Sequence, residues 1–269
     1  MEIGLLHHHE EVVPELLRAL TRQIERDGVL KHPVVVDEAT LVILDGTHRV
    51  EALRALGCRL VAACLVDYRE PRIELKSWYR TVRGASSLRE LVPILESQLG
   101  LRVEFCTKLR PEEVGVPPVA LGLADGHGFA RVLGDFNDKS EAWTLVKEVE
   151  GALRELGFEI GFEPEEDAMS KLGRGGAGVI LMTPRITKQD VVRTALSGRV
   201  FPHKATRHVI PARPLFLNIP LEALRGDRPL RAVEEELREL LASRKLRRVP
   251  PGQLIEGRRY EEEVFVLED

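Results

Sequence analysis

The stretch LVILDGTHRV, residues 41–50, passes from an apolar run directly into polar residues that can open a helix. Its four aliphatic residues predict a short buried strand. Val50, Leu53 and Leu56 follow at helical spacing, and Gly57 suits the end of that helix. Where a strand runs straight into a helix, the N–H groups of the first helical turn lack backbone partners and face outward together. The stretch therefore predicts an anion site, with phosphate as its natural ligand.

The five residues at this turn carry more polar groups than a helix start requires. Gly46 allows the backbone to approach a ligand closely, and Thr47 adds a polar group to the same turn. His48 and Arg49 add side-chain donors, and a guanidinium can bind a phosphate through two parallel hydrogen bonds. The alternative is that Asp45 is an ordinary N-cap and Arg49 a solvated surface cation. The concentration of functional groups in one turn favours phosphate binding.

Periodicity extends a mixed helix-and-strand pattern in both directions from the turn. Before it and just after it, the expected elements are a helix over 14–27 and extended segments over 33–36, 60–66 and 73–78. Small and polar residues at 83–87 then suggest a domain boundary. We expect an α+β fold with an N-terminal domain over 1–82 and a second α+β domain over 83–269. Its expected strands are 103–106, 119–123, 129–133, 179–182 and 263–267, and its expected helices are 88–99, 139–156, 188–196 and 230–241.

Composition is that of an ordinary globular chain. Of 269 residues, 43% are hydrophobic and 30% charged, so the signature of disorder is missing. The net charge of -4 argues against nucleic-acid binding, which needs a basic face. The sequence contains no apolar run long enough to cross a membrane and no signal-peptide pattern at its start, so we expect a cytoplasmic protein without a membrane partner. Its three cysteines lack the CxxC spacing of a structural zinc site.

The turn also resembles a known superfamily signature. The run ILDGTHR at 43–49, followed by Ala52-Leu53 and Leu56-Gly57, is similar to that of the ParB/sulfiredoxin-like superfamily. The resemblance implies a ParB/sulfiredoxin-like N-terminal domain that binds a nucleotide at this turn. It leaves several functions open, namely DNA partitioning, reduction of sulfinic acids and phosphorylation of small molecules.

Two further segments resemble the free L-serine kinases of that superfamily. His9-Glu10 precedes the first helix, where a His-Glu pair supplies the catalytic glutamate of those kinases. The segment 198–211 contains Thr206-Arg207-His208, which resembles a Thr-Arg-His stretch in their C-terminal domain. The resemblance thus spans both domains and implies an active site in the cleft between them. It also implies ATP or ADP as the phosphate donor and Mg²⁺ as the cofactor.

The implied reaction needs a base, because a serine hydroxyl is a poor nucleophile at neutral pH. A carboxylate within hydrogen-bond reach can accept its proton during attack on phosphorus. Glu10 is the candidate base, although a carboxylate before a helix can simply interact with the helix dipole. Asp45 is the second candidate, and it can also hold Mg²⁺ directly or through water. His9 can orient a phosphate, or it can be a solvated histidine.

Free serine presents a carboxylate and an ammonium, so its pocket needs a cation, acceptors and a close-fitting wall. Arg207 can pair with the carboxylate, and Thr206 and His208 offer hydrogen bonds beside it. Trp78 can form a wall. The alternatives are a core role for Trp78 and a structural carboxylate partner for Arg207.

The expected activity is therefore transfer of the terminal phosphate of ATP or ADP to free L-serine, giving O-phospho-L-serine. The competing hypothesis is a ParB-like, nucleotide-dependent DNA-binding protein or nuclease. Against it stand the acidic net charge and the lack of an obvious helix-turn-helix. A sulfiredoxin-like reductase would need a thiolate in the turn, where position 47 is Thr and Cys58 lies beyond the helix.

Overall fold

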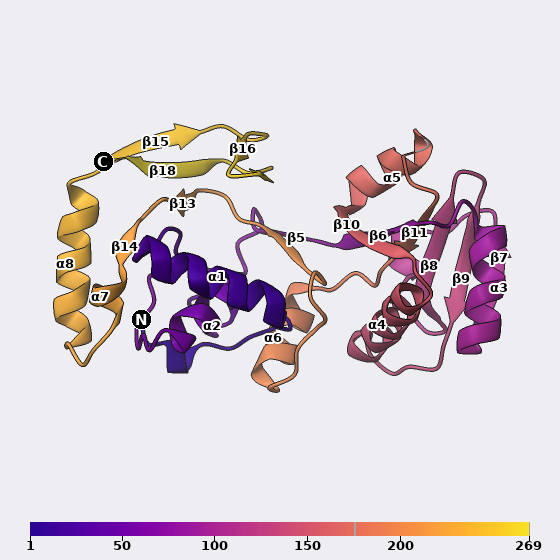
Figure 1. The fold of residues 1–269 in the computed structure, drawn as a ribbon, viewed down its shortest axis with the longest axis horizontal. Helices are drawn as coiled ribbons and strands as arrows, with labels where there is room; N and C mark the ends of the chain where they lie inside the picture. The colour runs from indigo at the N-terminus through magenta and orange to yellow at the C-terminus, as the bar shows by residue number, and fades with distance from the viewer. Residues whose placement is uncertain (175, 269) are drawn as a thin grey trace. The chain divides into compact units, whose positions relative to one another are not determined.

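A computed structural model describes residues 1–174 and 176–268 of the chain (Figure 1). The chain forms two compact units, each assembled from separate segments. The first unit comprises Met1–Glu74, Val192–His203 and His208–Asp269, and the second comprises Leu75–Val191 and Lys204–Arg207. Within the described residues, no helix combines the length and the apolarity that crossing a membrane requires.

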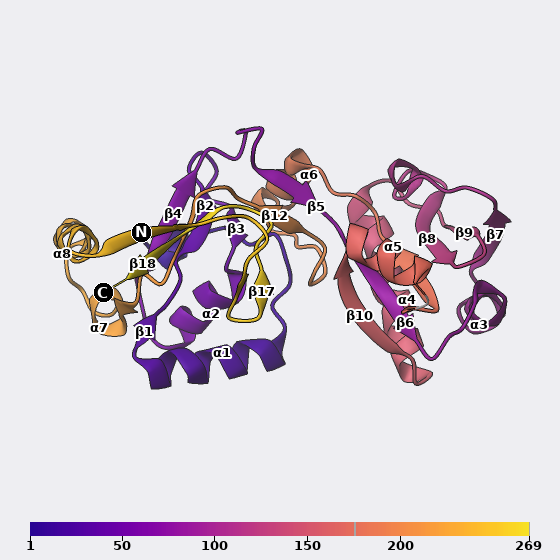
Figure 2. The same cartoon turned by 90° about the horizontal axis from the view of Figure 1, so that it is seen from above.

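The first unit is built around the turn at residues 45–47. Its N-terminal elements are η1 (Ile3–Leu5), α1 (Pro14–Asp27), β1 (Val29–Leu30), β2 (Val34–Asp37), β3 (Ile43–Asp45), α2 (Thr47–Ala55) and β4 (Ala63–Val66). Strand β2 lies in the middle of a three-stranded sheet, antiparallel to β3 and parallel to β4. All four residues of β2 are buried, as expected for a strand covered on both faces. Helix α1 packs along α2 (Figure 2).

Later segments of the chain complete the same unit. They contribute the second half of α6 (Lys188–Leu196), then β13 (Arg213–Leu215), β14 (Ile219–Pro220), α7 (Leu221–Leu224), α8 (Leu230–Ala242), β15 (Lys245–Val249), β16 (Leu254–Ile255), β17 (Arg258–Arg259) and β18 (Val264–Glu268). Strand β18 runs between β13 and β15, and β16 and β17 form a short hairpin. Strand β14 pairs with β1. Buried Leu217, Ile219 and Leu224 join Val34, Leu53 and other N-terminal residues in one hydrophobic core.

The second unit is an antiparallel sheet with helices on it. Its elements are β6 (Trp78–Arg83), α3 (Leu88–Leu99), β7 (Arg102–Cys106), η2 (Pro111–Glu113), β8 (Val119–Asp125), β9 (Phe129–Leu133), α4 (Lys139–Glu155), β10 (Glu159–Pro164), α5 (Glu165–Gly173) and β11 (Val179–Met182). The strand order is β10-β6-β11-β8-β9-β7. Strands β5 (Glu74–Lys76) and β12 (Arg207–Val209) lie where the chain passes from one unit to the other.

Alternate residues of β6 face opposite sides of this sheet. Tyr79 packs with Ala168 and Leu172 of α5. Its neighbour Arg80, which is completely buried, donates to Glu150 of α4 at 2.6 Å and lies 5.0 Å from the Trp143 ring. Helices α4 and α5 therefore cover opposite faces, and a buried charge is paired on the α4 side.

The predicted mixture of helices and strands is confirmed, and the main periodic segments are found. Helices α1, α3 and α6 and strands β9 and β11 have the expected bounds. The division of the chain differs from the boundary expected after residue 82. Strand β6 belongs to the second unit because it pairs with β10 and β11, which are strands of that unit. The chain after residue 208 belongs to the first unit because its apolar residues complete that core.

Candidate functional site

Strand β3 and helix α2 form the predicted strand-to-helix turn. Thr47 is the first residue of α2, and the Gly46 carbonyl accepts the first intrahelical hydrogen bond from the Val50 N–H at 3.0 Å. The N–H groups that precede Val50 in the helix lack an intrahelical acceptor, and the N-cap residue, Gly46, has no side chain to cap them. The turn therefore offers backbone donors and the positive end of a helix dipole to an anion.

Gly46 is required at this turn for two independent reasons. Its φ of +107° lies in the region that residues with side chains rarely adopt. A Cβ there would lie 2.7 Å from Val34 Cγ1 and 2.9 Å from Arg49 Nη2. The glycine thus lets β2, the turn and the Arg49 side chain lie in contact.

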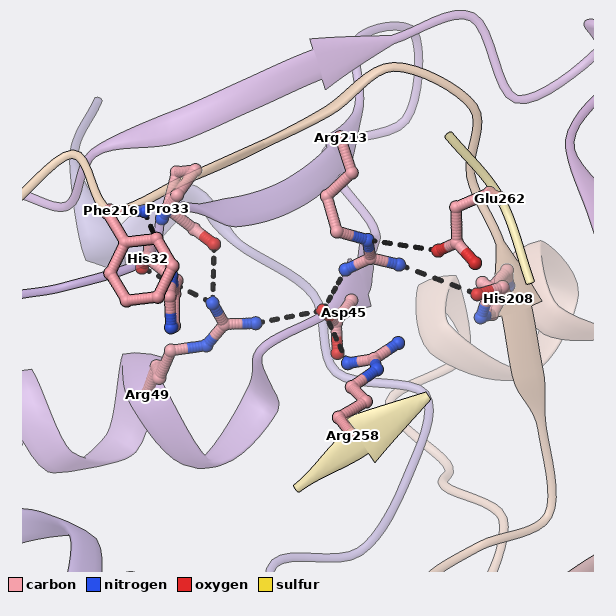
Figure 3. Close-up of polar contacts among 9 residues, drawn as sticks. All are labelled: His32, Pro33, Asp45, Arg49, His208, Arg213, Phe216, Arg258 and Glu262. Atoms are coloured by element: carbon pink, nitrogen blue, oxygen red, sulfur yellow. Dashed lines mark hydrogen bonds and ion pairs between the residues drawn. The ribbon is translucent and has the colours of Figure 1, made fainter. Parts of the chain in front are cut away.

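Asp45, the last residue of β3, lies among three guanidinium groups (Figure 3). Arg49 Nη2 donates to Asp45 Oδ2 at 2.9 Å, and Arg213 Nη1 donates to the same oxygen. Arg258 Nη1 lies 3.6 Å from that oxygen. Arg213 also donates to Glu262 at 3.3 Å and to the His208 carbonyl at 3.4 Å. Asp45 is therefore the centre of a cluster assembled from both ends of the chain.

The charge on Asp45 is strongly stabilised. Burial raises the pKa of its carboxyl, but the charges of Arg213, Arg49 and Arg258 outweigh burial and hold that pKa well below its usual range. A carboxylate with so low a proton affinity is a weak general base. The electrostatics therefore favour a binding role for Asp45 over its second expected role as the base.

Arg49 is more heavily engaged than the sequence indicated. Its Nη1 donates to the carbonyls of His32 at 3.2 Å and Pro33 at 2.6 Å, while its Nη2 binds Asp45. The guanidinium thus joins α2 to the start of β2. Binding a phosphate through two of its hydrogen bonds would require it to exchange some of these partners.

His9 lies against β3 inside the first unit. The side chain is 2% exposed, and its Nδ1 lies 2.7 Å from the Ile43 carbonyl, so Nδ1 carries the proton and donates. Burial lowers the pKa of His9, more than the nearby Glu10, the Ile43 carbonyl and Asp45 raise it. A neutral, buried imidazole suits a residue that positions the chain, whereas binding phosphate by charge needs the protonated ring.

Glu10 follows His9 and is held on both sides. Its backbone pairs with Phe201, because the Phe201 N–H donates to the His9 carbonyl and the Glu11 N–H to the Phe201 carbonyl, each at 2.8 Å. Three residues further on, the Val13 N–H donates to His48 Nε2 at 3.0 Å. The segment that contains Glu10 is therefore tied to β3 through His9 and to α2 through His48.

The three residues of the Thr206-Arg207-His208 stretch are divided between the two units. His208 belongs to the first unit, where its Nε2 lies 2.7 Å from the Tyr68 hydroxyl and its ring lies 5.4 Å from that of His9. Thr206 and Arg207 belong to the second unit together with Trp78. Trp78 Nε1 donates to the Thr206 carbonyl at 2.9 Å, and the Arg207 guanidinium lies 5.0 Å from the Trp78 ring.

Three residues of the Asp45 cluster were not predicted from the sequence. Arg213, Arg258 and Glu262 lie far from the turn along the chain and belong to no motif. Arg213 is 3% exposed and Glu262 7%, so both are buried charges that a partner must stabilise. Burial of a charged residue is a tertiary property, and the sequence around Arg213 and Glu262 carries no separate signal for it.

A divalent cation at this site would have to be held by one carboxylate together with phosphates and water. Within residues 1–174 and 176–268, no group of three or more His, Cys, Asp or Glu side chains is arranged to hold a metal ion. Magnesium in phosphate-transfer sites is commonly bound by one or two carboxylates together with phosphates and water. The two guanidinium hydrogen bonds to Asp45 both end on Oδ2, so Oδ1 is the oxygen that would accept from a metal-bound water. Asp45 would hold Mg²⁺ through that water, and its magnesium role stays a prediction.

Comparison with known proteins places this site in context, although no family model matches the chain. An ATP-dependent L-serine kinase of Staphylothermus marinus is 27% identical over 238 residues, which cover 84% of this chain and 90% of that protein. An ADP-dependent L-serine kinase, SerK of Thermococcus kodakarensis, is 25% identical over 83% of this chain and 91% of its own length.

A solved structure of a free serine kinase in complex with AMP has the same fold. The TM-score is 0.67 at 24% identity, over 83% of this chain and 92% of the kinase. The likeness therefore extends over nearly the whole of each relative and includes both units. In sequence, the chain is similar to the L-serine kinases that the turn at residues 45–49 and the His9-Glu10 pair resemble, and it shares the fold of the solved free serine kinase.

Proposed function

We propose that this protein is a small-molecule kinase that transfers the terminal phosphate of ATP or ADP to the hydroxyl of free L-serine. The product is O-phospho-L-serine. The similar kinases include one named as ATP-dependent and one named as ADP-dependent, so either donor is compatible with the family resemblance. Mg²⁺, when bound, would neutralise charge on the donor phosphates, with Asp45 as its protein partner through water.

In the proposed reaction, Glu10 accepts the proton of the serine hydroxyl as its oxygen attacks the terminal phosphorus. The P–O bond to the nucleotide breaks, and the nucleotide leaves with one phosphate fewer. The N–H groups at the start of α2 bind the phosphates and stabilise the negative charge of the transition state. His9 and His48 contribute by fixing the backbone on either side of Glu10.

The observation that carries this proposal is the way Glu10 is held. The His9 hydrogen bond to Ile43 joins its segment to the strand that leads into the phosphate turn, and the Val13 hydrogen bond to His48 joins it to the helix that follows. A base must be fixed to within a fraction of an ångström to be effective. Two independent attachments of this segment to the elements that flank Gly46 support the proposed role of Glu10.

The direct test is to incubate the purified protein with L-serine, Mg²⁺ and either ATP or ADP, and to identify the product by mass spectrometry. We expect O-phosphoserine with at least one donor. If the folded protein forms none with either nucleotide, the proposed function is wrong.

Glu10→Gln tests the role of the base within this function. The amide cannot accept the serine proton, so we expect kcat to fall by about 10²–10⁴-fold, the usual contribution of a general base. Nucleotide affinity, measured by isothermal titration calorimetry, should stay near the wild-type value because the turn is unchanged. Glu15→Gln is the matched control, since Glu15 is an exposed residue of α1 paired with Arg18. Near-normal turnover of Glu10→Gln would remove Glu10 from this role.

The roles expected for Trp78, Thr206, Arg207 and His208 in serine binding stay predictions. The stacking of Arg207 on Trp78 presents a cation beside an aromatic wall, which suits an amino-acid substrate. The competing hypothesis of a nucleotide-dependent DNA-binding protein has less support, because both similar proteins described above are named as serine kinases.

A further inference from the structure

The β16–β17 hairpin brings one arginine to the phosphate turn from the C-terminal part of the chain. Glu256 and Gly257 join the two strands, with φ values of +46° and +79°. Positive φ at both central residues is typical of a type I′ turn, which matches the natural twist of a tight hairpin. Arg258 follows immediately and points toward Asp45 (Figure 3).

The hairpin is attached to the first unit close to the turn. Glu256 accepts hydrogen bonds from Lys31 at 3.3 Å and from the His32 ring at 3.2 Å. The His32 carbonyl in turn accepts from Arg49. The Arg258 guanidinium lies 4.8 Å from the ring of Tyr260, which is only 6% exposed. Glu256 and Arg258 of the hairpin therefore both lie against buried or half-buried groups of the first unit.

Arg258 differs from the other two arginines of the Asp45 cluster in what its guanidinium does. The side chain of Arg213 is 3% exposed and that of Arg49 17%, and both donate hydrogen bonds to Asp45. Arg258 is 45% exposed, and its 3.6 Å separation from Asp45 exceeds hydrogen-bond length. Its side chain is thus partly exposed to solvent while it lies beside the turn.

The charge of the cluster points to an anionic ligand. Arg49, Arg213 and Arg258 face the two carboxylates of Asp45 and Glu262, so these five residues retain one positive charge. The positive end of the α2 dipole adds to it. A partly exposed guanidinium at such a place matches a phosphate group in charge and in hydrogen-bonding geometry.

We infer that Arg258 binds the donor nucleotide through a phosphate beyond the α-phosphate, so that the C-terminal hairpin forms part of the donor site. This inference rests on the proposed function for the identity of the donor. It assigns a role to a segment that no sequence motif singled out. Arg258 exchanges its long ion pair with Asp45 for shorter, charge-assisted hydrogen bonds to the phosphoanhydride end of ADP or ATP.

The test compares nucleotides that differ in that end. Binding of ATP, ADP and AMP in the presence of Mg²⁺ is measured by isothermal titration calorimetry for the wild type and for Arg258→Gln. Loss of a charge-assisted contact should lower the affinity for ADP or ATP about 10- to 100-fold. AMP, which lacks the phosphoanhydride, should bind within about twofold of wild type.

Two further variants sharpen the result. Arg258→Lys keeps the positive charge and should recover part of the lost ADP affinity. Arg247→Gln removes one arginine of β15 that pairs with Glu268, and it should leave all three affinities unchanged. Thermal unfolding of each variant shows whether it is folded.

The inference is overturned if Arg258→Gln binds ADP and ATP like the wild type, or if it lowers the affinity for AMP as much as the affinity for ADP. These measurements require no transfer to serine. Binding that depends on Arg258 without any phosphoserine formation would therefore contradict the proposed function and leave this inference standing.

Discussion

Asp45 shows how one residue can combine a structural and a binding role. Its side chain is 25% exposed, yet it pairs with Arg213, which is almost completely buried. Removing the carboxylate would leave the buried Arg213 charge with Glu262 as its remaining carboxylate partner. A buried charge that loses one of its two carboxylate partners is destabilised, so Asp45 matters for stability as well as for its proposed binding role.

We therefore expect Asp45→Asn to lower the free energy of unfolding by about 2–4 kcal/mol at pH 7. Because the folded-state pKa of Asp45 is depressed, its contribution is complete above the unfolded pKa of about 3.9 and is lost as pH falls through the folded value. The difference between wild type and variant should thus shrink below about pH 4. Urea unfolding at pH 7 and at lower pH measures both effects.

Asp67→Asn serves as the control for this experiment. Asp67 forms an exposed ion pair with Arg69, and such pairs contribute less than about 1 kcal/mol. If Asp45→Asn were no more destabilising than Asp67→Asn, the Asp45 cluster would not be the stabilising feature described above.

At the scale of single elements, the turn between β3 and α2 depends on the missing side chain of Gly46. Gly46→Ala introduces a Cβ that would overlap Val34 and Arg49, in addition to an unfavourable backbone conformation. We expect a loss of about 2–4 kcal/mol of stability together with weaker nucleotide binding, because any relief of the overlap moves the donors of the turn.

Gly28→Ala separates the two causes. Gly28 caps α1 with a φ of +66°, and a Cβ there would meet no atom within 4 Å. This variant should cost about 1 kcal/mol through conformation alone and should leave nucleotide affinity unchanged. Equal effects of the two variants in thermal unfolding and in nucleotide titration would refute the steric argument for Gly46.

At the scale of the whole molecule, neither unit is a continuous piece of the chain. The core of the first unit combines Val34, Ile43 and Leu53 with Leu217, Ile219 and Leu224 from far downstream. Strand β14 pairs with β1, and Arg213 of β13 pairs with Asp45. The N-terminal segment alone therefore lacks much of the apolar surface that its residues bury.

A fragment of residues 1–82, the domain suggested by the sequence, should consequently fail to fold on its own. A chain that loses this much core contact forfeits several kcal/mol, which is a large share of the usual stability of about 5–15 kcal/mol. We expect poor amide dispersion in its NMR spectrum and no cooperative thermal transition. A well-dispersed spectrum and a sharp transition for this fragment would show that the downstream segments are dispensable.

The sequence by itself determined the local elements and the turn. The apolar spacing of α1, the aliphatic run of β3 and the Gly46-Thr47 start of α2 depend on neighbours within a few residues, which periodicity and capping preferences describe well. The same local information supported the resemblance to the serine kinases, which the comparisons confirm.

Only the tertiary structure decided how the site is assembled. Arg213 reaches Asp45 across 168 residues of sequence. Arg258 enters the same cluster from the β16–β17 hairpin, and Glu262 enters it from the bend before β18. It also gave Arg49 and His48 backbone partners at Pro33 and Val13. Such contacts depend on which distant segments pack together, and a single sequence carries no periodic signal for packing between segments so far apart.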